Sequence, residues 1–467
     1  MDRCTLIRTR GESHAVSETT DAASSADAYR GEPSRRKLLE IARYYLFIGI
    51  VGFGGPLVHI AMMESDLVGE DSREWTDEST FMEGLAICNT LPGPASTQLG
   101  IFMGWIYAGN PGAVVAGFFF MLPTFVIVVF FSWLYFAYQA VPSVEALFYG
   151  INPVVIGLIV GASWSMAQSA LAEGRTDAEF RLGAETWSID YLLVGLLAAA
   201  IVVTATIGTN PVVQFVVAGA IAVGIYRSTW VRRNWRRVSV WTIGGAITLT
   251  AFTLRDRLFD LLGPAARRTI EASPLWGLLL AIWANPWVQL FAFMIYTGSF
   301  IYGGGLVLIP FIELYVVSEF GWMTGREFVD GIAIGQLSPG PVVMTTAFVG
   351  YKLMLDTYGL VSIAVVGAFV AMVGAFGPSF AFIMGFFPYF ARVRENDIVQ
   401  SALVGVNAAV VGAILGATVT LALESFVDSF TVALAAVTSV LFVRDVHAAF
   451  LILGGGGVGM AWYFLVV

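Results

Sequence analysis

The sequence has few charged residues and few of the residues that bind metals. Only 13% of its 467 residues are charged, and it contains 2 cysteines and 3 histidines, none close to another. An average soluble domain has about a quarter charged residues, so this composition excludes a soluble enzyme. Neither a disulfide framework nor a metal or cofactor site is expected. Acidic residues outnumber basic ones by 34 to 25, which excludes a nucleic-acid partner.

What the sequence has in abundance is apolar stretches of about 20 residues, each long enough to cross a bilayer core of about 30 Å. The chain is 57% hydrophobic, with a mean hydropathy of +0.77. This pattern predicts an all-α polytopic membrane protein embedded in the lipid bilayer, with about 12 or 13 transmembrane helices. The predicted spans lie near 38–60, 81–109, 111–138, 146–171, 189–207, 211–226, 286–312, 328–355, 358–387, 400–422, 429–443 and 446–466.

Charge predicts the boundaries of the domains. Residues 1–33 are polar and are expected to form a disordered cytoplasmic tail, because basic residues at 35–37 directly precede the first span. An arginine-rich linker at 227–285 separates the repeats predicted at 34–226 and 286–467. Residues 238–254 of this linker are apolar enough to form one more span. Charge leaves open whether they cross, and therefore how the second half is oriented.

The sequence contains an internal repeat. FGG at 53–55 recurs as YGG at 302–304, and the LPGP that ends at Pro94 recurs as SPGP ending at Pro341. Gly-Ile-Asn at 150–152 recurs as Gly-Val-Asn at 405–407, and Pro123 recurs as Pro378. These matches in one order predict two homologous halves. Such duplication is typical of secondary transporters, whose substrate site lies at the repeat interface.

Both Pro-Gly-Pro motifs lie inside otherwise apolar spans and are predicted to break them, because proline removes a backbone donor and glycine frees the dihedral angles. A half-helix that begins after each break would point free N–H groups at an anion. Ser96 and Thr97 after the first break, and Thr345 and Thr346 after the second, add hydroxyl groups. Simple kinks that shape the bundle are the alternative. The substrate-binding candidates are Gly54, Gly55, Pro56, Asn89, Pro92, Gly93, Pro94, Gln98, Gly303, Gly304, Gln336, Pro339, Gly340 and Pro341.

A second group of residues consists of candidates for coupling or gating. His59, Glu64 and Glu313 are ionisable residues near span ends, where a proton carrier and a solvated side chain are both open interpretations. Lys352 either attracts an anion or extends toward the interface. Asn152 and Asn407 lie on glycine-rich stretches that are typical of close helix contact, and each is either a contact between helices or a ligand donor.

The runs FGGPLVHIAMMESDLV and LPGPASTQLG, with YGGGLVLIPFIELYVV and GWMTGREFVDGIAIGQLSPGP, resemble the signatures of the chromate ion transporter family. The resemblance covers both repeats. It implies an inner-membrane protein that exports chromate, with sulfate as a competing or exchanged ion. It also implies halves inserted in opposite orientations and an odd number of spans. The chain departs from the family at Asn89, where the family generally has Gln, and this shorter amide is expected to alter substrate preference.

We therefore predict a secondary transporter that exports a divalent tetrahedral oxyanion such as chromate. A passive anion channel, or a permease for another oxyanion such as sulfate, is the alternative. An enzyme is not expected, because reactive side chains are sparse and scattered. The sequence has no Walker motif, so ATP is not expected to drive transport within this chain. Whether the protein forms a homo-oligomer stays open.

Overall fold

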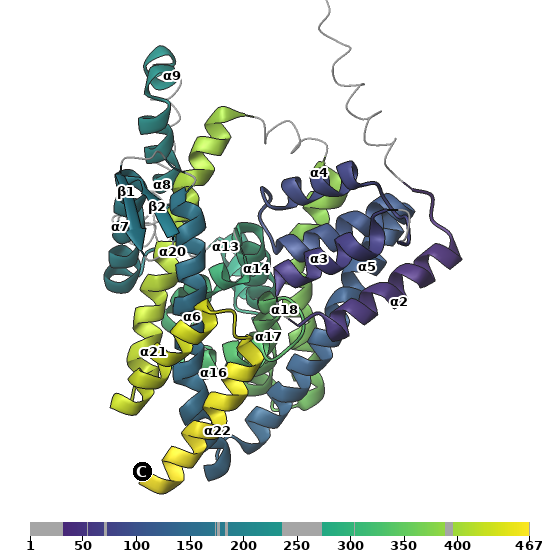
Figure 1. Ribbon diagram of the computed structural model, residues 1–467. Helices are drawn as coiled ribbons and strands as arrows, with labels where there is room; N and C mark the ends of the chain where they lie inside the picture. Colours follow the sequence, from purple (N-terminus) through teal and green to yellow (C-terminus); the bar gives the residue numbers. More distant parts are fainter. Residues whose placement is uncertain are drawn as a thin grey trace, which may run out of the picture.

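The computed structural model describes residues 31–53, 55–69, 72–172, 174, 178–182, 185–235, 273–302, 304–387 and 396–466. These residues are mostly helical, as predicted, and they include one β-hairpin that the sequence analysis did not predict (Figure 1). Most of the predicted tail and the candidate span at 238–254 lie outside the described residues.

The elements of the first half are α2 (Arg35–Val51), α3 (Pro56–Leu67), α4 (Glu78–Cys88), α5 (Ala95–Tyr138), α6 (Pro142–Ala172), β1 (Ala178–Leu182), β2 (Glu185–Ile189), α7 (Tyr191–Ile207), α8 (Pro211–Tyr226) and α9 (Ser228–Arg233). Strands β1 and β2 pair antiparallel. The second half follows with α13 (Pro274–Trp283), α14 (Pro286–Phe300), η1 (Gly305–Val307), α15 (Leu308–Ile312), η2 (Glu313–Glu319), α16 (Gly325–Gln336), η3 (Val342–Met344), α17 (Thr345–Tyr358), α18 (Val361–Ala381), η4 (Phe382–Phe386), α20 (Asp397–Ser425), α21 (Ser429–Val443) and α22 (Ala448–Val466).

The helices are broken at both Pro-Gly-Pro motifs, as the sequence predicted. Helix α4 ends at Cys88 and α5 begins at Ala95, while α16 ends at Gln336 and η3 begins at Val342. Within α5, Ala108 and Gly109 have non-helical dihedral angles, and Gly104 before them packs against Gly112 and Ala116 after them, so α5 consists of two helical parts that fold back on each other. Five helices of the described residues are long and apolar enough to cross a membrane, namely α5, α6, α18 with η4, α20 and α22. Helices α7, α8 and α21 are apolar but shorter, and the count of 12 or 13 spans stays a prediction.

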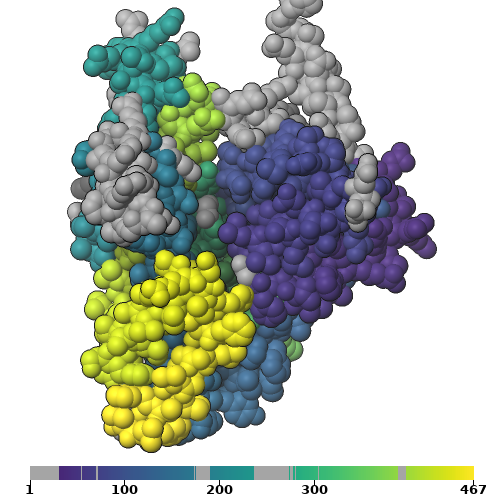
Figure 2. Space-filling view, viewed as in Figure 1, coloured from purple at the N-terminus to yellow at the C-terminus, as the bar shows by residue number. Residues whose placement is uncertain are grey.

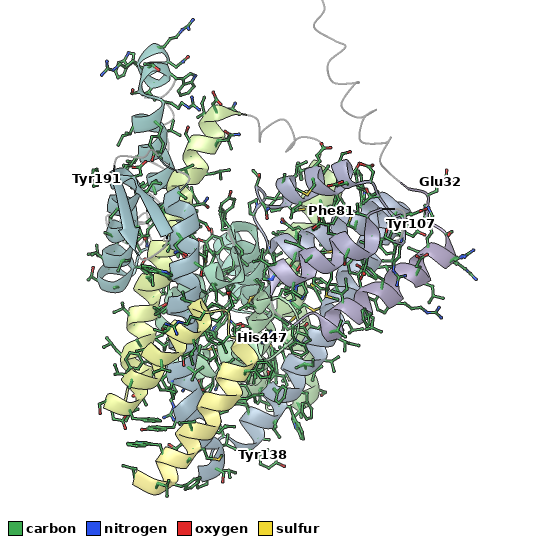
Figure 3. The ribbon with its side chains drawn as sticks, viewed as in Figure 1. Glu32, Phe81, Tyr107, Tyr138, Tyr191 and His447 are labelled. Carbon is green, nitrogen blue, oxygen red and sulfur yellow. The ribbon has the colours of Figure 1, made fainter. Side chains whose placement is uncertain are left out.

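The two halves are inverted relative to each other. Helices α6 and α20 occupy matched positions in the repeat, and they pack against each other. Tyr149, near the start of α6, donates a hydrogen bond to Asp428 beyond the end of α20, at 2.6 Å. Ala167, near the end of α6, packs in one cluster with Val411 in the middle of α20. Matched helices therefore run antiparallel, which confirms the opposite orientations implied by the family resemblance. In Figure 3, Tyr138 at the end of α5 lies at the bottom of the view and Tyr191 at the start of α7 lies at the upper left. Helix α6, which lies between them in the chain, therefore runs upward in this view.

The helices form two groups, and each group contains matching elements of both halves (Figure 1). The continuous-helix bundle consists of α6 to α8 and α20 to α22. In it, α6 packs against α21 and α22 of the other half, and α20 packs against α7 and α8. The broken-helix bundle consists of α2 to α5 and α14 to η4, where α5 meets α18. In Figure 2, α2 to α4 (purple) and α21 with α22 (yellow) lie on opposite sides of the visible face.

Matched glycines allow the close contacts of the continuous-helix bundle. A Cβ at Gly157 would lie 2.8 Å from Thr438 Cβ on α21, and one at Gly412 would lie 2.7 Å from Ala200 Cβ on α7. Gly150 likewise contacts α22, and Gly405 contacts α8. Because lipid tails are as apolar as leucine, small residues that bring backbones together drive such helix association. The glycine stripes of the repeat are thus contacts between the halves.

Candidate functional site

The first break is attached to the second half of the chain. The Gly93 amide donates to the Ile301 carbonyl at 2.5 Å, and Gln98 Nε2 donates to the Pro92 carbonyl at 2.5 Å. The same Nε2 lies 3.5 Å from Ser379 Oγ on α18. Gly93 has φ +132, and a Cβ there would come within 2.5 Å of Ser379 Oγ. Only glycine fits this conformation and this contact.

The second break is attached in turn to the first half. His59 Nε2, on α3, lies 3.0 Å from the Pro339 carbonyl and 2.7 Å from the Gly52 carbonyl. Because both partners are acceptors, Nε2 carries the proton and donates it to them. A Cβ at Gly340 would overlap Thr124 Oγ1 on α5. The imidazole therefore connects the turn after α2 with the break of the opposite half.

The two contacts are related by the repeat. Thr124 follows Pro123, and Ser379 follows the matched Pro378, so the two hydroxyl residues occupy equivalent positions. Each break thus packs against the hydroxyl residue of the opposite half. The two prolines match in the repeat, but Thr124 and Ser379 were not among the predicted site residues. A hydroxyl residue directly after both matched prolines was the signal that could have found them.

Several buried polar groups at the two breaks lack a protein partner among the described residues. The hydroxyl groups of Ser96, Thr97 and Thr124 are fully buried and make no hydrogen bond, and neither do Gln98 Oε1 and His59 Nδ1. An unsatisfied buried polar group costs about 1–3 kcal/mol, so native proteins rarely keep several of them together without a reason. Two of these hydroxyl donors lie in the first turn of α5, the third lies against Gly340 of the second break, and together they suit a ligand that is rich in acceptors.

The remaining substrate-binding candidates lie at the helix ends that flank the breaks or at the glycine motifs before α3 and η1. Asn89 directly follows α4 and is exposed, and Gln336 ends α16 and is half-buried. Pro94 and Pro341 immediately precede α5 and η3. At the other motif, Gly55 and Pro56 begin α3 and Gly304 precedes η1, while Gly54 and Gly303 lie outside the described residues.

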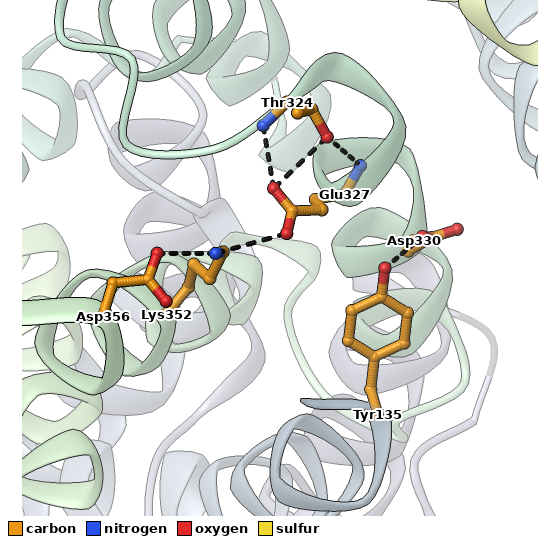
Figure 4. Close-up of polar contacts among 6 residues, drawn as sticks. All are labelled: Tyr135, Thr324, Glu327, Asp330, Lys352 and Asp356. Carbon is orange, nitrogen blue, oxygen red and sulfur yellow. Dashed lines mark hydrogen bonds and ion pairs between the residues drawn. The ribbon is translucent and has the colours of Figure 1, made fainter. Parts of the chain in front are cut away.

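The charged coupling candidates are not gathered at the breaks. Glu64 is exposed on α3, whereas the matched Glu313 is half-buried and lies 3.5 Å from Ser318. Lys352 forms ion pairs with Glu327 at 3.3 Å and Asp356 at 2.5 Å (Figure 4). Its positive charge is therefore engaged by two carboxylates.

The buried carboxylate of Asp330 was not among the residues that the sequence predicted. Asp330 on α16 is 2% exposed, and its Oδ2 accepts a hydrogen bond from Tyr135 at 2.6 Å (Figure 4). Asn152 of α6, a predicted candidate, approaches the same carboxylate. The signal was present, because Asp330 is an ionisable residue inside a predicted span. Asn407, the repeat counterpart of Asn152, lies on α20. Within the described residues, no group of three or more metal-binding side chains could hold a metal ion.

Inverted halves, helices broken at matched positions and a continuous-helix bundle define a multi-pass membrane protein with the architecture typical of secondary transporters. The chain matches the chromate transporter family at residues 39–225 and 288–460, and it belongs to that family. The resemblance seen in the motifs is thereby confirmed.

Several named proteins are similar over most of their length. The chromate transport protein of Cupriavidus metallidurans is 29% identical over 428 residues, covering 91% of this chain and 93% of that protein. The probable chromate transport protein of Synechococcus elongatus is 30% identical, covering 86% of this chain and 89% of that protein. The chromate transport protein of Pseudomonas aeruginosa is 29% identical, covering 88% and 86%. No solved structure matches the chain.

Proposed function

We propose that the protein is a secondary transporter that exports chromate across the inner (cytoplasmic) membrane, with its N-terminus in the cytoplasm. The substrate site lies at the paired breaks. Family membership and the names of the relatives support chromate as the substrate. The observation that carries the location of the site is the set of unpartnered hydroxyl groups on Ser96 and Thr97 at the first break and on Thr124 at the second.

A tetrahedral oxyanion supplies the acceptors that these groups lack. Each hydroxyl group can donate one hydrogen bond to an oxygen of the anion, and the first-turn amides of α5 add the positive end of a helix dipole. His59 holds the second break through its Nε2–H, which donates to the Pro339 carbonyl, whereas its Nδ1 is an acceptor and gives the anion no hydrogen bond. Sulfate has the same shape and charge as chromate, so it is expected to compete for this site.

A difference between the halves supports alternating access. Helix α16 packs against α6 and α20 of the continuous-helix bundle, whereas α4 packs against α5. At matched positions, Asp330 is buried and Glu83 is exposed, and Glu313 is half-buried while Glu64 is exposed. Since the halves are inverted copies, exchanging their two conformations gives a second state that faces the other side of the membrane. This asymmetry favours a transporter over a passive channel.

The membrane potential supports export. Moving each negative charge out of a cell that is negative inside is favourable by about 2.3 kcal/mol per 100 mV. A dianion gains twice this amount, so export needs no ATP.

The test is uptake of labelled chromate into everted vesicles, with and without excess sulfate. We expect saturable uptake that sulfate inhibits, and we expect Thr124→Val and Ser96→Ala to weaken it by about tenfold, because each loses one hydrogen bond to a charged group, worth about 1.5 kcal/mol. Ser132→Ala is the control on the same helix, because its hydroxyl is already bonded to the Val128 carbonyl. Uptake equal to that of empty vesicles would remove chromate as the substrate, and non-saturable flux would favour a channel.

A further inference from the structure

Asp330 is a buried carboxylate that the proposed transport site does not use. It lies on α16 between the two bundles, in contact with Tyr135 at the end of α5 and close to Asn152 on α6. It forms no ion pair with any residue that the structure describes. A buried carboxylate without a cation is costly in its ionised form, because the charge has lost its water.

Two acceptor atoms at this place lack donors. Asp330 Oδ1 and Asn152 Oδ1 are both buried, and neither has a hydrogen-bond partner in the described part of the chain. The side chain of Asn152 is hydrogen-bonded to the Asp330 carboxylate. When Asp330 Oδ1 carries a proton and the Asn152 amide turns to present its Oδ1, the O–H group donates to that oxygen and both atoms are satisfied. The Tyr135 hydroxyl donates to the other oxygen, Oδ2, and this bond is compatible with a protonated acid.

The charged groups of the surrounding elements are engaged elsewhere or point outward. Helix α22 and η3 carry no charged residue. Arg326, on α16 itself, is exposed. Lys352 of α17 forms ion pairs with Glu327 and Asp356. Glu424 of α20 lies against Gly325, and Glu313 of η2 lies near Ser318. Glu145 of α6 is exposed, and Asp428 accepts a hydrogen bond from Tyr149.

We propose that Asp330 is a proton-binding site which couples proton movement to the exchange of the two conformations, an inference that rests on the proposed transport function. In the present state the carboxylic acid is closed between α16, α5 and α6 and shares its proton with Asn152. In the exchanged state α16 takes the position of α4, where the matched Glu83 is exposed. Asp330 then meets water and releases the proton, becoming a carboxylate. Binding and release each move one proton and no electrons.

The first experiment needs no chromate. Infrared difference spectra of the purified protein in nanodiscs, recorded as the pH is changed, are expected to show the C=O stretch of a buried carboxylic acid. This band is expected to be lost in Asp330→Asn and retained in the matched control Asp356→Asn, which removes an exposed carboxylate on α17. A band that survives in Asp330→Asn would overturn the assignment.

A second variant keeps the proposal testable if Asp330→Asn does not fold. Asn152→Leu removes the acceptor but keeps the acid, so the band is expected to remain and move to higher wavenumber as the hydrogen bond is lost. An unshifted band would show that Asn152 does not share the proton, which would also overturn the proposal.

The third experiment tests coupling. Chromate uptake into everted vesicles is expected to respond to an imposed pH gradient in the native protein and in Asp356→Asn, and to be the same with and without the gradient in Asp330→Asn. Uptake that depends on a Na⁺ gradient and ignores pH would overturn the proposal. If no protein takes up chromate, the proposed function fails, while the infrared spectra still decide whether Asp330 binds a proton.

Discussion

Gly340 of the second half lies so close to Thr124 of the first half that a Cβ at position 340 would overlap the threonine hydroxyl. The matched contact joins Gly93 to Ser379, so each break is held by the long helix of the opposite half. Because the two contacts involve both halves, a change at one glycine affects how the halves pack.

Gly340→Ala is expected to lower the melting temperature and to reduce chromate uptake, because overpacking a buried contact typically costs about 1–3 kcal/mol. Adding Thr124→Ala makes room for the new methyl group and is expected to restore much of the stability but not the uptake. Gly377→Ala on α18 is the control, since a Cβ there meets no atom within 4 Å. Equal melting temperatures for Gly340→Ala and Gly377→Ala would contradict the packing seen here.

Gly412→Ala tests the glycine stripes. Its Cβ would contact the Leu197 carbonyl and lie 2.7 Å from Ala200 Cβ on α7, so we expect a loss of about 1–3 kcal/mol of stability. Gly195→Ala, on α7 with open space around it, is expected to leave stability unchanged or raise it by up to about 1 kcal/mol through helix propensity. Thermal unfolding in detergent compares the two, and similar melting temperatures would argue against a close contact at Gly412.

Tyr149→Phe tests the hydrogen bond that joins α6 to the loop before α21. A hydrogen bond from the Tyr149 hydroxyl, and to a smaller extent one from the Thr431 amide, holds the pKa of Asp428 below its usual value. The stability gained from this depressed pKa is present at neutral pH and is lost as the pH falls through the depressed value. Without the tyrosine hydroxyl the pKa rises, so we expect about 1 kcal/mol less stability at pH 7 and acid destabilisation that begins at a higher pH.

Melting temperatures recorded from pH 7 downward measure this effect. Tyr138→Phe is the control, because Tyr138 is 48% exposed at the surface. An acid transition at the same pH in Tyr149→Phe and Tyr138→Phe would show that the bond to Asp428 does not contribute.

Glu83→Cys together with Asn407→Cys tests the exchanged state, in a background where Cys4 and Cys88 are serine. Asp330 approaches Asn152 in this structure, so its repeat counterpart Glu83 is expected to approach Asn407 in the other state. We expect a cross-link between the two cysteines whose yield changes when chromate is added. Failure to cross-link at any pH or chromate concentration, while Glu83→Cys alone stays reactive toward a maleimide, would contradict alternating access by repeat exchange.

Much of the fold could be predicted because it depends on local properties of the chain. Apolar length predicted the helices, and the proline and glycine motifs predicted where α4 and α16 end, since these residues act on their own backbone. The repeat predicted two homologous halves. The β-hairpin was missed because its strands, Ala178–Leu182 and Glu185–Ile189, are short and lie in a polar connection between two spans.

The candidate site was predictable only in part. Pro92, Gly93, Pro339 and Gly340 were found from their motifs, and their roles as substrate ligands stay predictions. Thr124, Ser379 and Asp330 were missed, because their importance arises from neighbours about 200 or more positions away, or from burial that charge and hydropathy do not show. Glu64 and Glu313 were found as candidates, but their different exposure was not, because they look equivalent in sequence.

The sequence by itself therefore determined the class of protein, the duplication and the positions of the helix breaks, because hydropathy, proline and glycine act within one segment. Only the tertiary structure decided that α6 and α20 run antiparallel, that each break packs against the opposite half, and that Asp330 is buried while Glu83 is exposed. Two inverted copies of one sequence can take different conformations, since each residue's burial is set by the helices packed around it.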